Sequence, residues 1–159
     1  MNKALRALVF ASLALIGQQA FAVSPTIQHI PTDVTFRDSS CGFVISAHIT
    51  GTVVDMSYTD AQGVLHDHQA FPNGIAVITN VVTGKSVTLN ISGPGKFTTD
   101  PDGSIVVVFT GNILNFVDPD TLLPGLFLLN GRLVFFVDAN GAFTSTRTGH
   151  KTSVCAMVQ

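Results

Sequence analysis

Apolar and polar residues alternate along most of this chain, with a turn signal every eight to twelve positions. The clearest alternation is the segment SVTLNI at residues 86–91, whose three apolar side chains fall on one face of an extended strand. We find no amphipathic helix of ordinary length, internal repeat or linker after residue 22. The pattern predicts the strands Val34–Arg37, Phe43–Met56, Val64–Gln69, Ile75–Val82, Ser86–Ser92, Lys96–Thr99, Ser104–Thr110, Ile113–Val117, Gly125–Leu129, Arg132–Val137, Ala142–Thr148 and Thr152–Met157.

Glycine, asparagine and aspartate mark the turns that we expect between these strands. Asn130-Gly131 is the strongest hairpin signal, because both central positions of a two-residue turn need a positive φ. The segments Asp100–Gly103 and Asp138–Gly141 carry similar turn residues. A break or bulge is expected at Gly51. Short connections of this kind predict an all-β protein with an antiparallel meander.

The two cysteines, Cys41 and Cys155, are expected to form one disulfide, because an even pair in a secreted chain is most simply a structural bridge. Their spacing is too long for a short metal-binding pair. The bridge would bring the first and last parts of the fold together. We therefore expect the sheet to close into a β-barrel, which leaves no exposed edge strand. A two-layer β-sandwich with adjacent ends is the alternative.

The first 22 residues have the features of a secretory signal peptide. A positively charged start precedes an apolar run over residues 7–16, and the AFA motif at residues 20–22 is a small-x-small cleavage site. The run is shorter than the roughly 20 apolar residues that span a bilayer. We expect one all-β domain over residues 23–159, secreted to the extracellular space, or to the periplasm of a host with an outer membrane, and not inserted into a membrane.

The composition favours β-strands over helices, and the net charge argues against binding to nucleic acid or to an anionic membrane. Residues 23–159 contain six basic and ten acidic residues, and every acidic residue is Asp. Seventeen threonines supply much of the polar surface, and the lack of Glu leaves few residues that suit solvated helices. A net charge near −4 without a basic cluster argues against binding nucleic acid or an anionic membrane surface.

Two predicted strands contain runs that are apolar on both faces, Ile105–Phe109 and Leu133–Val137. In a thin sheet, such runs need a cover for the second face. A flanking loop such as Pro119–Pro124 would provide it, and so would a subunit interface in a homo-oligomer. A barrel interior that holds a small apolar ligand is the third interpretation.

Titratable groups crowd at residues 66–68, with the sequence His-Asp-His. Both imidazoles would share one face of a strand and could reach one metal ion if a third ligand were close. The residues that could supply that ligand are His48, Asp55 and His150. Nothing in the sequence places them there, so we predict no metal ion and no cofactor. His66, His68 and Tyr58 are nevertheless the candidates for contact with a ligand or a metal.

No motif supports catalysis, and we assign no catalytic residue. Gly-x-Ser-x-Gly does not occur, and the Asp-rich segments 100–103 and 138–141 lack the Glu that a calcium loop requires. The leading interpretation is a non-catalytic binding protein. An extracellular or cell-surface protein that interacts or self-associates is one alternative. A barrel isomerase or cyclase that acts on an apolar substrate through His66, His68 and Tyr58 is another.

The segment GKSVTLNISGPG at residues 84–95 also resembles part of a family of small secreted proteins, frequent in high-GC Gram-positive and related bacteria. The similarity continues in DGS at 102–104, TGN at 110–112, DANG at 138–141 and Val154-Cys155, and covers about residues 73–157. The resemblance implies one secreted β domain, a signal peptide, a late cysteine and a bacterial source. It implies no activity, cofactor or catalytic residue.

Overall fold

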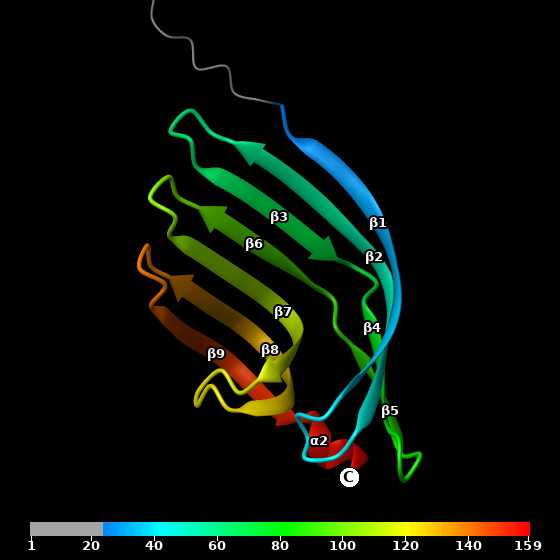
Figure 1. Cartoon of the computed structure of the whole chain (residues 1–159). Coiled ribbons are helices and arrows are strands. Elements are labelled where there is room, and N and C mark those ends of the chain that lie inside the picture. Colours follow the sequence, from blue (N-terminus) through cyan, green and yellow to red (C-terminus); the bar gives the residue numbers. More distant parts are fainter. Residues whose placement is uncertain (1–23) are drawn as a thin grey trace, which may run out of the picture.

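The computed structural model describes residues 24–159, which form one antiparallel sheet and a short C-terminal helix (Figure 1). The elements are β1 (Thr26–Asp38), β2 (Ile45–Thr59), β3 (Leu65–Phe71), β4 (Ile75–Asn80), β5 (Ser86–Asn90), β6 (Gly93–Thr99), β7 (Ile105–Val117), β8 (Pro124–Val137), β9 (Phe143–Ser153) and α2 (Val154–Val158). The predicted all-β class is confirmed. The predicted signal peptide, residues 1–22, lies outside the described residues. Within residues 24–159, no helix has the length and apolar character needed to cross a membrane.

The sheet branches at β2. One edge of β2 pairs with β1 from Ile45 to Ser57, whereas the other edge pairs first with β4 and then with β3. The β4 branch continues to β5, and the β3 branch continues through β6, β7 and β8 to β9. Gly51, where we expected a break, lies between the two pairing segments with a φ of 146°. The strand runs on through it, and only its partner changes.

The sheet is not closed, so the structure does not support the predicted barrel. β1, β5 and β9 are edge strands, and β1 and β9 do not pair with one another. The strands also belong to one hydrogen-bonded sheet and not to the two sheets of a sandwich. The sheet instead curls, with β1 and β2 on one side of Figure 1 and β7, β8 and β9 on the other.

The predicted disulfide between Cys41 and Cys155 is confirmed, with 5.3 Å between the two Cα atoms. It joins the β1–β2 connection to α2, and not β1 to β9. The expectation of a closed barrel was wrong because a bridge from a loop to a terminal helix does not align two edge strands. Ser153 ends β9 and caps α2, so the predicted last strand, Thr152–Met157, is helical over most of its length.

The buried core lies at the end of the sheet that is next to α2, between the two branches. The fully buried large side chains at this end are Ile45, Ile78, Leu126, Val154 and Val158. Asn80 is also buried there, and its Nδ2 donates to the Val158 carbonyl oxygen at 3.1 Å. The Asn80 Oδ1 accepts from the backbone N–H groups of Val82 and Thr83. One polar side chain therefore attaches α2 to the β4–β5 hairpin.

Strands β7, β8 and β9 bend where three glycines lie opposite one another (Figure 1). Gly111, Gly131 and Gly149 have φ values of 91°, 151° and 95°. A Cβ atom on Gly131 would overlap the Thr148 carbonyl oxygen, so the approach of the two backbones requires glycine. The predicted hairpin at Asn130-Gly131 is wrong, because the positive φ bends the continuous strand β8 and does not reverse the chain.

Candidate functional site: the concave basin

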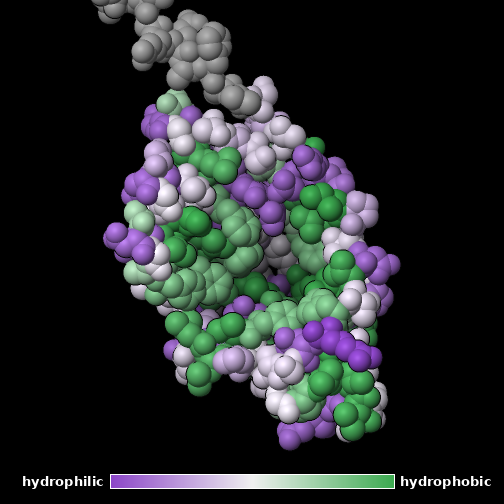
Figure 2. Space-filling view, in the orientation of Figure 1, coloured by the Kyte–Doolittle hydropathy of each residue, from purple (hydrophilic) through white to green (hydrophobic). Residues whose placement is uncertain are grey.

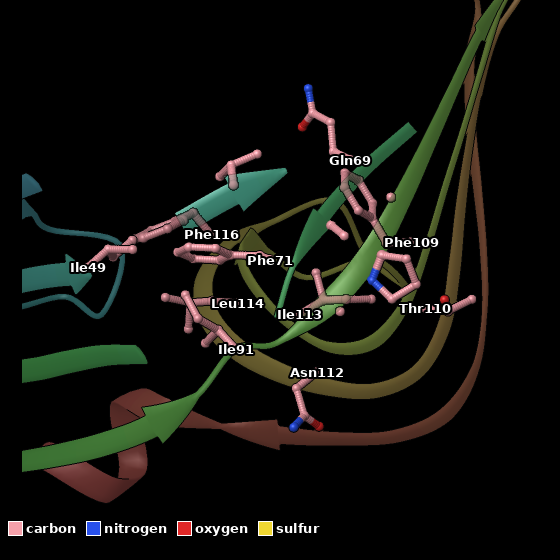
Figure 3. A pocket seen from close by; sticks show the side chains of 15 residues that line it. Ile49, Gln69, Phe71, Ile91, Phe109, Thr110, Asn112, Ile113, Leu114 and Phe116 are labelled. Atoms are coloured by element: carbon pink, nitrogen blue, oxygen red, sulfur yellow. The ribbon is translucent and has the colours of Figure 1, made fainter. Parts of the chain in front are cut away.

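The concave face of the curled sheet is hollowed, and hydrophobic residues border the hollow (Figure 2). A cavity of about 260 Å³ lies between β2 and β3 on one side and β6 and β7 on the other. Its apolar lining includes Ile49, Val53, Phe71, Ile91, Phe109 and Phe116. Figure 3 shows several of these side chains converging from different strands. We call this space the first cavity and the whole hollow the basin.

Four phenylalanines extend the apolar surface from the first cavity across β6, β7, β8 and β9. Phe97 and Phe109 have ring centroids 5.5 Å apart, Phe109 and Phe135 6.4 Å, and Phe135 and Phe143 5.4 Å. Gly95 leaves room for this row, because a Cβ atom there would lie 2.9 Å from the Phe109 ring. We call these four residues the phenylalanine wall.

A second cavity of about 330 Å³ lies at the far end of the phenylalanine wall, beside the loop of residues 118–123. Its lining residues are Asn115, Val117, Pro119, Leu122, Phe135 and Phe143. This loop is the one that we proposed as a cover for the second face of the apolar strands. Pro119 and Leu122 of the loop line this cavity together with Phe135 and Phe143, so the loop lies on the basin face and not on the opposite face of β7 and β8.

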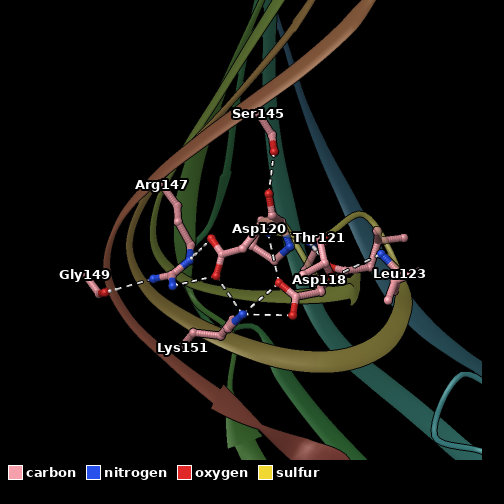
Figure 4. Close-up of polar contacts among 11 residues, drawn as sticks. Asp118, Asp120, Thr121, Leu123, Ser145, Arg147, Gly149 and Lys151 are labelled. Atoms are coloured by element: carbon pink, nitrogen blue, oxygen red, sulfur yellow. Dashed lines mark hydrogen bonds and ion pairs between the residues drawn. The ribbon is translucent and has the colours of Figure 1, made fainter.

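An ion-pair network attaches this loop to β9 (Figure 4). Lys151 Nζ lies 2.7 Å from both Asp118 Oδ1 and Asp120 Oδ2, and Arg147 Nε donates to Asp120 Oδ1 at 2.7 Å. Ser145 Oγ donates to the carbonyl oxygen of Pro119. The hydrogen bonds from Arg147 and Lys151 hold the pKa of Asp120 at about 2, and those from Lys151 and the Asp120 backbone lower the pKa of Asp118. Both basic side chains are therefore already neutralised.

Two carboxyl groups lie at the other end of the basin. Asp55 of β2 is opposite Gln69, and Asp67 of β3 is opposite Ser57, so the two aspartates are diagonal neighbours on one face. The Oδ1 atom of each is enclosed and has no hydrogen-bond partner. Burial, followed by the hydrogen bond and the charge of Asp55, raises the pKa of Asp67. Gln69 Nε2 donates to Asp67 Oδ2 at 3.3 Å.

Sequence reasoning missed this pair. It named Asp55 only as one of three residues that could complete a metal site with His66 and His68, and it gave Asp67 no role. The eleven residues between the two aspartates carry no signal of proximity, because only the register of β2 against β3 brings their carboxyl groups together.

The structure brings the predicted candidates Tyr58, His66 and His68 together on the convex face. The Tyr58 ring stacks on His66 at 4.9 Å and on His68 at 6.1 Å between centroids. His66 Nε2 lies 2.8 Å from Asp60 Oδ2, and this hydrogen bond lowers the pKa of Asp60. Because side chains alternate along a strand, these three point away from the face that carries Asp67.

The residues that could complete a metal site are not gathered around His66 and His68. His48 Nε2 lies 2.8 Å from Asp33 Oδ1, and Asp55 lies on the concave face. Within the described part of the chain, no three His, Cys, Asp or Glu residues are grouped so that they could hold a metal ion.

Fold and site together define a disulfide-linked β-protein with one curled, open sheet and an apolar basin. No family model matches the chain, and no curated protein or solved structure matches it either. The resemblance to small secreted bacterial proteins therefore stays a prediction. The function has to be argued from the basin itself.

Proposed function

We propose that this protein is a non-catalytic binding protein that holds a small apolar ligand in its basin. The observation that carries this proposal is the first cavity, of about 260 Å³, with its largely apolar lining that continues into the phenylalanine wall. Small-molecule sites are typically concave and mostly apolar, with a small number of polar groups that orient the ligand. Transfer of an apolar ligand from water to such a surface contributes roughly 25 cal/mol for each Å² that it buries.

The positions of the titratable side chains favour binding over catalysis. An isomerase or cyclase would need polar groups inside the hollow, and the residues that we named for this role were Tyr58, His66 and His68. All three lie on the convex face, away from the first cavity. A ligand in the first cavity would contact mainly hydrocarbon, which supports retention of the ligand and not its conversion.

We also propose that the protein binds this ligand outside the cytoplasm. The Cys41–Cys155 disulfide is consistent with an oxidising compartment. Apolar molecules have low solubility in water, so an extracellular protein with an apolar basin is suited to carry or sequester them.

Substitutions on the two faces of β7 test the binding proposal. Val107 lies opposite Phe135 on the face of the phenylalanine wall, whereas Val108 points to the other face. We expect Val107→Asp and Phe135→Asp to abolish binding, because a carboxylate would have to be desolvated against the apolar ligand. Val108→Asp is the matched control and should keep the ligand.

The measurement is native mass spectrometry of protein purified from the secretion medium of its host. We expect a reproducible extra mass on the wild type that leaves on denaturation, and its loss from Val107→Asp. Circular dichroism verifies that each variant is folded. Unchanged ligand uptake by folded Val107→Asp, or a clean monomer mass for the wild type, would contradict the proposal.

Self-association through the convex face is a second candidate function. Val106, Val108, Val134 and Phe136 form an apolar patch on adjacent strands, and Phe136 is 39% exposed. The loop of residues 118–123 lies over the other face and does not cover it. If the patch is an interface, sedimentation should show a dimer in the wild type and a monomer in Phe136→Asp. A wild-type mass that stays monomeric at all concentrations would rule out this function.

A further inference from the structure

The two cavities of the basin are linked by the phenylalanine wall. Phe109 lines the first cavity and Phe135 lines the second, and the centroids of these two rings are 6.4 Å apart. Both rings lie on one face of the sheet, because Phe109 pairs with Leu133, which is two residues from Phe135. A ligand that extends beyond the first cavity therefore meets a second apolar hollow on the same face.

The polar lining residues belong mainly to the first cavity. Gln69, Thr110 and Asn112 are among the residues that line it. The lining of the second cavity includes one polar residue, Asn115, whose Nδ2 donates to the Val117 carbonyl oxygen at 2.6 Å. Because a few polar groups orient the ligand in most binding sites, the first cavity suits the polar end of a ligand. The second cavity suits hydrocarbon.

The charged side chains next to the second cavity are bound to one another (Figure 4). Lys151 Nζ lies 2.7 Å from both Asp118 Oδ1 and Asp120 Oδ2. Arg147 Nε lies 2.7 Å from Asp120 Oδ1. Two basic and two acidic groups are matched within this network, so it gives a charged ligand group little reason to lie there. The network instead fixes the loop of residues 118–123 beside the cavity.

Leu122 of this loop has an unfavourable backbone conformation. Its φ is 59°, and among the described residues no other non-glycine residue has a positive φ. This left-handed region favours glycine and asparagine over leucine. The Leu122 N–H donates to the Asp118 carbonyl oxygen at 2.8 Å and helps to hold the conformation. Such a backbone at a residue that lines a cavity indicates that its side chain has a role there.

We propose that the ligand of the basin is an amphiphile with one extended hydrocarbon chain, which crosses the phenylalanine wall and ends in the second cavity against Leu122 and Phe143. Its polar end lies in the first cavity. A compact apolar molecule would occupy the first cavity alone. This inference rests on the proposed binding function, since it names the class of ligand and adds a second subsite to the same basin.

Two alcohols of different shape test the inference. Decanol and adamantanol have the same number of carbon atoms and one hydroxyl group each, but decanol is an extended chain and adamantanol is a compact cage. Their affinities for the full protein are measured by titration calorimetry. We expect the wild type to bind both, with decanol in the two cavities and adamantanol in the first.

Leu122→Asn should separate the two ligands. We expect the affinity for decanol to fall roughly tenfold, because a leucine contact is lost and an amide is desolvated in its place. The affinity for adamantanol should not change. Asparagine suits the left-handed backbone, so thermal unfolding should show a folded variant that is no less stable than the wild type.

Two further variants serve as controls. Leu123→Asn changes the adjacent leucine, which is 65% exposed and is not among the residues that line the second cavity, so both affinities should stay as in the wild type. Val53→Asp places a carboxylate in the first cavity and should weaken both ligands. Circular dichroism verifies that each variant is folded.

The outcomes distinguish the inference from the proposed function. If Leu122→Asn leaves the affinity for decanol unchanged, or lowers both affinities equally, the extended ligand is overturned while the binding function stands. If neither alcohol binds the wild type, or if folded Val53→Asp binds both as the wild type does, the proposed function itself fails.

Discussion

The two halves of β2 lie in different surroundings, although they belong to one strand. At its start, Ile45 and Ala47 are fully buried between the β4–β5 hairpin and the elements around α2. In its second half, Asp55 faces an open basin and keeps a carboxyl oxygen without a partner. The closed end of the molecule gains stability from packing. The open end leaves apolar surface and two carboxyl oxygens without partners.

Removal of the disulfide should have the largest effect on the free energy of unfolding. It should change the closed end and leave the basin unchanged. We expect Cys41→Ser with Cys155→Ser to lower the free energy of unfolding by about 2–5 kcal/mol, because the bridge restricts a long loop in the unfolded chain. Chemical denaturation gives this value. Ligand affinity, measured where the variant is still folded, should not change.

A loss of affinity in the folded, disulfide-free protein would break the comparison. It would show that the conformation of the basin depends on the disulfide at the closed end. The matched control is the wild type under reducing conditions, in which the same bridge is opened without substitution.

The next effect concerns Asn80, the polar side chain inside the closed end. Asn80→Ala removes a donor to Val158 and an acceptor for two backbone N–H groups, so we expect a loss of about 1–3 kcal/mol in the free energy of unfolding. Asn130→Ala is the control, because Asn130 donates to Asn112 at an exposed position. Its effect should stay within about 0.5 kcal/mol. Equal effects of the two substitutions would contradict the structural role of Asn80.

The smallest effects should appear in the pH dependence of stability, with opposite signs at the two ends of the basin. The pKa of Asp67 is raised from 3.8, so its contribution to stability is present below that value and is lost as the pH rises through the higher, folded-state pKa. The pKa of Asp120 is lowered from 3.8 to about 2, so its contribution is present above 3.8 and is lost as the pH falls towards 2.

Thermal unfolding across an acidic to neutral pH series measures both contributions. In Asp67→Asn, the loss of stability that the wild type shows as the pH rises through the pKa of Asp67 should be absent. In Asp120→Asn, the loss of stability that the wild type shows as the pH falls towards 2 should be absent. Identical pH profiles for the wild type and both variants would show that neither carboxyl group has a shifted pKa in the folded protein.

Local signals explain which parts of the fold could be predicted. Alternation along a strand depends on near neighbours, so most strands of the sheet were expected from the sequence, and an even pair of cysteines was enough to predict the disulfide. The prediction of a hairpin at Asn130-Gly131 was wrong because a positive φ is compatible both with a turn and with a bend in a continuous strand. The choice depends on Gly111 and Gly149, which lie opposite Gly131 only after β7, β8 and β9 have paired.

The candidate site shows the same limit. The spacing of His66 and His68 places them on one face of a strand, and the structure agrees that they share it. Which face is concave depends on the curl of the whole sheet, and the sequence contains no local sign of it. The apolar runs in β7 and β8 did indicate that both faces of these strands are apolar. One of the two faces carries Phe109 and Phe135 of the phenylalanine wall.

The sequence by itself determined the all-β class, most strand positions and the pairing of Cys41 with Cys155, because these follow from side-chain periodicity and composition. The tertiary structure decided that the sheet stays open, that three glycines bend it, and that Asp55 and Asp67 meet beside an apolar cavity. These features depend on strand register and curl, which arise from contacts between residues that are distant in the chain.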